Sequence, residues 1–171
     1  MRRSAPALPR EHDVATRLLD ELMADSNLLV ARARALPLPP GGRAWVRVAD
    51  SRDADAWLIT WAAGSATGSH DHGDSSGIIG LLHGALVERY WLDEPAGRAR
   101  QLRAGGRILV PTGRRHDVAN TGPGLAISLH VYAPRLTAMT RYELDGGARG
   151  TTTRFVARVV PGAVTVRVPS G

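Results

Sequence analysis

The pattern of apolar and polar positions divides the chain into a short helical start and a longer extended part. Asp13 is a residue type that caps helix N-termini, and apolar side chains follow it at helical spacing up to Met23. A second helix is predicted over 28–36, and the proline- and glycine-rich segment 37–42 ends helical structure. Beyond it, extended runs separated by glycine or proline roughly every ten residues are typical of an all-β barrel or sandwich, here with a helical lid at its N-terminus.

The extended runs predict the strands of one domain. They lie at 45–48, 56–61, 78–82, 85–91, 107–110, 125–132, 154–159 and 164–168. A chain of 171 residues is long enough to bury its own core and too short for a second one. We therefore expect a single domain over 1–171, with a barrel over 44–168 and, over 1–40, a helical extension with a mobile start.

Composition supports the barrel and excludes several kinds of chemistry. Gly 19 and Pro 11 suit turns between short strands, and the absence of cysteine excludes disulfides, zinc–thiolate sites and cysteine nucleophiles. No apolar run approaches the roughly 18 residues of a membrane span, and the N-terminus lacks the apolar stretch of a secretory signal. We therefore expect a cytoplasmic protein with no membrane partner.

The net charge of +6 is carried entirely by arginine, because the chain contains no lysine. The arginines are scattered singly or in pairs and form no stripe interleaved with aromatic residues. That distribution does not favour nucleic-acid binding.

Three histidines form the candidate metal site. His70 and His72 are two residues apart, so that on a strand they project from one face and one metal ion could take both imidazoles. His116 follows the turn Pro111-Thr112-Gly113 in a separate strand region. Three neutral imidazoles suit iron, zinc, copper or nickel, whereas magnesium and calcium prefer oxygen ligands. The alternative is a polar loop or surface strand in which the histidines are solvated.

The spacing around these histidines resembles the two motifs of the cupin superfamily. The first is Gly64-x5-His70-x-His72 with Gly84 closing the segment, and the second is Gly105-x5-Pro111-x-Gly113-x2-His116-x3-Asn120. Ser76 and Gly77 stand where the usual cupin ligand glutamate falls, and neither is a carboxylate. A three-histidine site without that carboxylate resembles the thiol dioxygenase branch, the cysteine dioxygenase family.

Further residues between about 45 and 144 carry the same resemblance. Trp61 lies nine residues before His70, and the run 70–75 reads His-Asp-His-Gly-Asp-Ser. Ser128-Leu-His130-Val-Tyr132 resembles the Ser-His-Tyr triad of the family, and alternation places these three side chains on one strand face. Some members crosslink a cysteine to the tyrosine; Gly77 occupies that position here, so Tyr132 is expected to stay an unmodified phenol.

The resemblance implies a cupin double-stranded β-helix, a jelly-roll-like barrel, with N-terminal helices. It implies Fe(II) held by His70, His72 and His116, and the oxidation of a small thiol by O2 to its sulfinate. Tyr132 would act as hydrogen-bond donor or proton relay, with His130 orienting its hydroxyl and Ser128 behind it.

The resemblance also implies an arginine for the substrate carboxylate, on an early strand two residues after an aromatic. Trp45-Val46-Arg47 has that form, and Arg43 and Arg52 are competing candidates. Members that act on 3-mercaptopropionate carry a glutamine nearby, whereas the one glutamine here is Gln101. L-Cysteine is therefore the favoured substrate.

Three other functions remain open: a dioxygenase for another small thiol such as 3-mercaptopropionate, a non-thiol cupin metalloenzyme, and a metal-dependent binding module without catalysis. We expect a monomer or a weak homo-oligomer.

Overall fold

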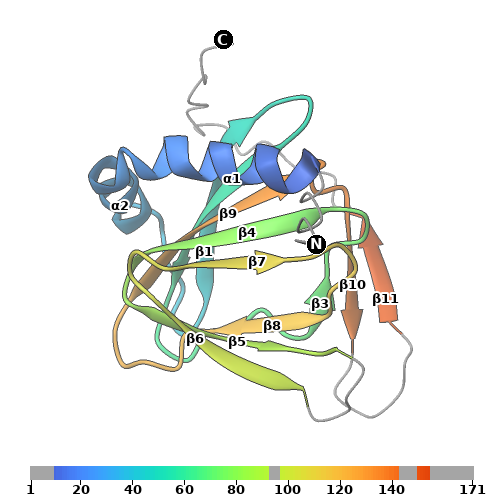
Figure 1. The fold of residues 1–171 in the computed structure, drawn as a ribbon. Coiled ribbons are helices and arrows are strands. Elements are labelled where there is room, and N and C mark those ends of the chain that lie inside the picture. The colour runs from blue at the N-terminus through green and yellow to red at the C-terminus, as the bar shows by residue number, and fades with distance from the viewer. Residues whose placement is uncertain (1–9, 93–96, 143–149, 155–171) are drawn as a thin grey trace, which may run out of the picture.

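The strands of the computed structural model, which describes residues 10–92, 97–142 and 150–154, form two antiparallel sheets that face each other (Figure 1). Two helices precede them, α1 (Arg10–Met23) and α2 (Ser26–Arg34). The strands are β1 (Arg43–Asp50), β2 (Asp55–Trp61), β3 (His70–Asp71), β4 (Ser76–His83), β5 (Ala85–Tyr90), β6 (Arg98–Arg103), β7 (Arg107–Val110), β8 (His116–Ala119), β9 (Ala126–Ala133), β10 (Ala138–Tyr142) and β11 (Gly150–Arg154).

The strand order confirms the expected all-β architecture with N-terminal helices. One sheet runs β1-β2-β9-β4-β7 and the other β11-β10-β3-β8-β5-β6, so neighbours in space are mostly distant in sequence. The sequence-adjacent pairs β1–β2, β5–β6 and β10–β11 are hairpins. The sheets thus enclose a barrel interior that receives side chains from both.

Strand β9 lies at the centre of its sheet, and all of its residues are buried. Ile127, Leu129 and Val131 point to the outer face, where they join the core formed with the helices. Ser128, His130 and Tyr132 point into the barrel. Because side chains alternate along a strand, one apolar strand supplies both the helix-packing surface and a polar row inside the barrel.

The expected helical lid covers the outer face of the β1-β2-β9-β4-β7 sheet (Figure 1). Leu19 and Met23 of α1 lie directly over Gly80 of β4, where a Cβ atom would be only 2.8 Å from the Met23 sulfur. Thr60 Oγ1 of β2 donates a hydrogen bond to the Ala33 carbonyl of α2, at 3.0 Å. The helices therefore cap an apolar surface on the far side of the sheet from the barrel interior.

The observed elements differ from the predicted ones where the apolar pattern is weak. Helix α1 begins at Arg10, so Asp13 lies inside it and is not its N-cap, and α2 begins two residues before the predicted helix. The predicted runs leave out β3, β6, β8 and β10 and overlap β11 only at Arg154. Strand β6 is largely exposed, and neither β6 nor β10 shows regular alternation of burial. The predicted mobile start and the runs at 155–159 and 164–168 lie outside the described residues.

One part of the barrel interior is apolar. Trp61 and eight aliphatic side chains from both sheets pack there: Ile79, Leu81, Leu86, Leu102, Ile108, Val110, Val118 and Ala126. Beyond this apolar cluster, the barrel interior holds the polar side chains of β9, Ser128, His130 and Tyr132. No helix among the described residues is long and apolar enough to cross a membrane.

Candidate metal centre and active site

The structure brings His70, His72 and His116 together as predicted. His70 on β3 is paired in register with His116 on β8, and His72 follows directly after β3. The Nε2 atom of His72 lies 3.2 Å from that of His70 and 3.3 Å from that of His116, and all three imidazoles are buried. Among the described residues this is the one cluster of His, Cys, Asp or Glu whose geometry could hold a metal ion.

The loop that precedes His70 is fixed against β8, which explains how the two halves of the triad keep their spacing. Thr67 Oγ1 accepts a hydrogen bond from the Val118 amide at 2.9 Å, and the Asn120 amide donates to the Ser65 carbonyl at 2.9 Å. Asn120, the last residue of the second motif, also donates its side-chain amide to Gly124 at 2.7 Å. The motif residues outside the triad thus hold backbone segments.

The outer nitrogens of two ligands fix which nitrogen carries the proton. His70 Nδ1–H donates to the Gly68 carbonyl at 2.8 Å, and His116 Nδ1–H donates to a Glu88 carboxylate oxygen at 2.8 Å. An imidazole with one proton that donates it from Nδ1 carries a lone pair on Nε2, and in His70 and His116 this Nε2 atom faces His72. At most one of the two contacts with His72 can be a hydrogen bond, so the centre suits a cation that accepts all three lone pairs.

Burial keeps His70 and His72 neutral. Burial, with the nearby His116 next in effect, lowers the pKa of His70 to about 3. Burial, followed by the neighbouring His116 and His70, holds the pKa of His72 well below its usual range. Neutral imidazoles are the form that binds a metal ion, so the site is ready to coordinate at neutral pH.

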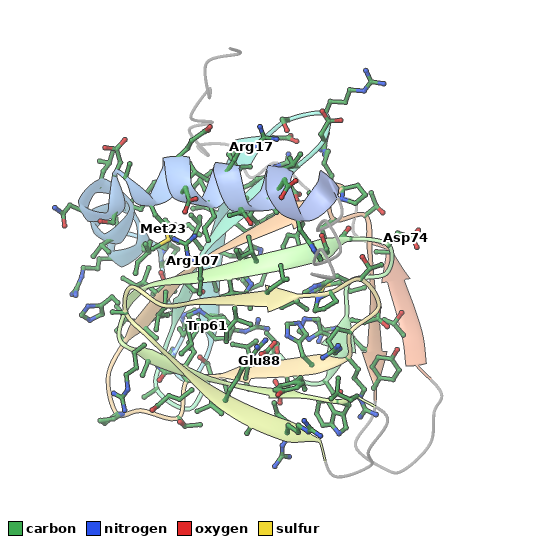
Figure 2. All side chains as sticks on the ribbon, in the orientation of Figure 1. Arg17, Met23, Trp61, Asp74, Glu88 and Arg107 are labelled. Atoms are coloured by element: carbon green, nitrogen blue, oxygen red, sulfur yellow. The ribbon has the colours of Figure 1, made fainter. Side chains whose placement is uncertain are left out.

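The row on β9 forms a hydrogen-bonded chain beside the triad. Trp61 Nε1–H donates to Ser128 Oγ at 2.8 Å, Ser128 Oγ lies 3.0 Å from His130 Nε2, and the Tyr132 hydroxyl lies 3.4 Å from His130 Nδ1. The Tyr132 ring packs edge-on against His72 with centroids 4.7 Å apart, so the chain ends at the metal centre. Figure 2 shows Trp61 directed into the space between the sheets.

Burial and charge determine the protonation of this chain. Burial, followed by the charges of His116, His70 and Arg43, lowers the pKa of His130 to about 3. Burial, and then the carboxylate of Asp55, raises the pKa of Tyr132 above its usual range. At neutral pH the chain therefore contains a neutral imidazole and a protonated phenol.

Gly77 faces the phenol ring. It is paired with Tyr132 across β4 and β9, and a Cβ atom at Gly77 would lie 3.2 Å from Tyr132 Cε1 and 3.6 Å from His72 Nδ1. A side chain at Gly77 would therefore crowd the Tyr132 ring, and glycine leaves that space free.

The three candidate arginines lie in different environments. Arg47 pairs with Asp50 at 3.0 Å and its guanidinium lies over Trp57. Arg43 stacks 5.2 Å from the Trp61 ring centre, has no ion pair among the described residues, and its charge lowers the pKa of both His70 and His130, after larger effects of burial and neighbouring histidines. Arg52 is exposed in the β1–β2 turn.

Sequence reasoning missed Glu88. It is 1% exposed on β5, and its two oxygens accept from His116 and from Arg100. The signal was a charged residue two positions after the apolar Leu86, on the same inward face of a strand. A carboxylate at an inward position is informative because buried charges require partners.

Solved structures share this fold. The protein TT1209 from Thermus thermophilus is 28% identical, with 60% of this chain and 92% of that chain covered and a TM-score of 0.52. An uncharacterised conserved protein with a double-stranded β-helix domain from Klebsiella pneumoniae subsp. pneumoniae MGH 78578 is 20% identical over 59% of this chain and 84% of that one, with a TM-score of 0.51. An oxalate oxidase in complex with glycolate is 19% identical over 56% of this chain and 53% of that one, with a TM-score of 0.50.

These neighbours, of which the second and third show the fold alone, confirm the double-stranded β-helix of the cupins. No curated protein matches the chain. The model of the family described as cysteine dioxygenase type I matches residues 9–145, which include the three histidines, the Ser-His-Tyr row and Trp61. The chain therefore belongs to the cysteine dioxygenase type I family.

Proposed function

We propose that this protein is a non-haem Fe(II) thiol dioxygenase that converts a small thiol, with L-cysteine favoured, to its sulfinate. The observation that carries the proposal is the arrangement of three buried histidines whose imidazole nitrogens face one another. Beside them lies the protonated Tyr132, at the end of a buried hydrogen-bonded chain. The thiol R–SH and O2 give R–SO2H, so both oxygen atoms enter the product. Sulfur loses the four electrons that O2 gains, and no further reductant is needed.

Iron is proposed because three imidazoles without a carboxylate are the donor set that the family membership associates with it. When bound by His70, His72 and His116, Fe(II) supplies open coordination positions and lowers the pKa of a coordinated thiol. The residues around it exclude water, because all three imidazoles are buried. A dry site strengthens each electrostatic interaction with a substrate.

The contacts of Ser128 give the hydrogen-bonded chain a direction. Its hydroxyl accepts the Trp61 indole proton, and among the described residues His130 Nε2 is its hydrogen-bond partner that can accept. If Ser128 donates there, the neutral His130 carries its proton on Nδ1 and donates it toward the Tyr132 oxygen. The phenol proton of Tyr132 is then free to be donated to a bound substrate.

The substrate carboxylate is proposed to bind on the inner face of β1. Arg47 is the residue that the sequence resemblance names, and it stays a prediction. Two observations support Arg43: it lacks an ion-pair partner among the residues described, and its charge affects His130 and Tyr132. A half-buried guanidinium is suited to take up a carboxylate in a bidentate pair.

The decisive experiment measures both products of the reaction. The protein is loaded with Fe(II) and given L-cysteine in air, while O2 uptake and cysteine sulfinate are followed together, with His116→Ala as the control. We expect one sulfinate for each O2 consumed, and a lower rate with cysteamine, which lacks the carboxylate. Oxygen uptake that yields only disulfide, or none above the control, would reject the thiol dioxygenase. A higher rate with 3-mercaptopropionate would keep the chemistry and replace the substrate.

A further inference from the structure

Only one of the three metal-ligating histidines is backed by a carboxylate among the described residues. His70 donates its Nδ1 proton to a neutral carbonyl, and the Nδ1 of His72 is buried without a hydrogen-bond partner in that part of the chain. His116 donates to Glu88, which is as deeply buried as the imidazole itself. The three ligands therefore differ in the hydrogen-bond partner of their Nδ1 atoms, and only that of His116 is a carboxylate.

Strand pairing places Glu88 where it can reach this ligand. Glu88 of β5 is paired with Val118 of β8, and Tyr90 of β5 is paired with His116, so the carboxylate and the imidazole lie diagonally on one inward face. Figure 2 shows the Glu88 side chain between the two sheets. Its position is set by two strand pairings and not by a flexible loop.

Arg100 completes the arrangement from the neighbouring strand. It is paired with Glu88 across β5 and β6, and its Nε donates to the second carboxylate oxygen at 2.5 Å. Its Nη2 donates to the Leu109 carbonyl on β7, at 3.1 Å, so the guanidinium spans the edges of the two sheets. The Arg100 side chain is 42% exposed, whereas the Glu88 side chain is 1% exposed. Both oxygens of this buried carboxylate are therefore hydrogen-bonded, one to His116 and one to Arg100.

We propose that Glu88 is a positioning residue that sets the affinity of the centre for its metal ion through His116, and that Arg100 opposes that effect. A carboxylate that accepts a hydrogen bond from Nδ1–H fixes the tautomer of the imidazole and makes its Nε2 atom a stronger electron-pair donor to a metal ion. Imidazole ligands carry no negative charge, so the carboxylate of Glu88 places a negative charge behind His116, one side chain away from the metal ion. Arg100 forms an ion pair with the same carboxylate and offsets part of its negative charge, which weakens the effect of Glu88 on His116.

The test uses Co(II) as the probe, with no thiol and no O2, so that its result is independent of the proposed oxidation. Glu88→Gln keeps the size and one acceptor oxygen but removes the charge. We expect the variant to bind Co(II) roughly 10–100-fold more weakly, with a shifted visible absorption spectrum. The matched control is Asp117→Asn, which makes the same carboxylate-to-amide change next to His116 at a residue that contacts Thr67 instead of the imidazole.

A second variant tests the sign of the effect. Arg100→Gln leaves Glu88 in place and removes the opposing charge, so it should bind Co(II) more tightly than the parent and shift the spectrum in the opposite direction. A pair that served only the packing of the barrel would weaken binding in both variants. Equal Co(II) affinities of Glu88→Gln and Asp117→Asn would overturn the proposal. If Glu88→Gln does not fold, the Arg100→Gln variant decides by itself: unchanged or weaker Co(II) binding by that variant would overturn the proposal.

Discussion

Replacing Tyr132 by phenylalanine separates the proposed chemistry of the hydroxyl from its contribution to folding. The change removes one oxygen and keeps the ring that packs against His72 and Gly77. The hydroxyl has one hydrogen-bond partner among the described residues, His130 Nδ1, at the long distance of 3.4 Å. Losing so weak a bond should lower the free energy of unfolding by no more than about 1 kcal/mol.

The expected effect on turnover is larger. If the hydroxyl donates a proton or hydrogen bond to the substrate, kcat should fall roughly 10-fold or more, since a general acid or base typically contributes about 100-fold or more. A 10-fold loss corresponds to about 1.4 kcal/mol of transition-state stabilisation. The Fe(II) content should not change, because the three ligands and their partners are untouched. Urea unfolding, metal analysis and sulfinate production on one preparation measure all three quantities.

Ser128→Ala is the matched comparison, because it acts on the same chain from its other end. It leaves the buried Trp61 indole N–H without its acceptor, which should lower the free energy of unfolding by about 1–3 kcal/mol. The two variants should therefore differ in kind: Tyr132→Phe loses turnover more than stability, and Ser128→Ala loses both. Unchanged turnover in Tyr132→Phe would refute the donor role and leave Tyr132 as packing.

The remaining predictions concern the metal, the carboxylate and pH. His116→Ala should lose stoichiometric iron and activity together, by metal analysis and O2 uptake; retention of full iron would reject the three-ligand site. Arg43→Ala should raise KM for L-cysteine roughly 10–100-fold and change KM for cysteamine little. A larger rise in KM for L-cysteine in Arg47→Ala would show that Arg47, and not Arg43, binds the substrate carboxylate. The metal-free protein should lose stability as pH falls from about 6.5 toward 3, because the unfolded chain then protonates histidines whose folded pKa is near 3. Urea unfolding should show about 1.4 kcal/mol per pH unit for each such group, and His130→Gln should reduce the slope by one group.

The sequence predicted those site residues whose spacing is local. His70 and His72 are close in the chain, and Ser128, His130 and Tyr132 follow one strand with a period of two, so alternation alone placed them on one face. The second motif added His116 through a resemblance to known spacings. These residues are where the structure places the centre.

The partners that depend on strand register were not predictable. Glu88 is 28 residues from His116 and meets it only because β5 pairs with β8. Arg43 and Arg47 share the inward face of β1, and the sequence could not show that Asp50 pairs with Arg47 and leaves Arg43 without an ion pair among the described residues. The helices were predicted, but the sheet face that they cover was not, because an apolar stripe shows that a helix is packed and not what it packs against.

The charges around the centre favour an anionic substrate. The three imidazoles supply no negative charge, and the carboxylate behind them is already shared between His116 and Arg100. Arg43 is a nearby cation without an ion pair in the part of the chain that the structure describes. A divalent ion held there keeps its full charge, and Arg43 adds another positive charge on the inner face of β1. A small molecule with a thiolate for the ion and a carboxylate for the guanidinium would neutralise both, whereas cysteamine would neutralise only one. The proposed preference for a carboxylated thiol thus rests on two features together, a set of ligands without a carboxylate and the cation of Arg43.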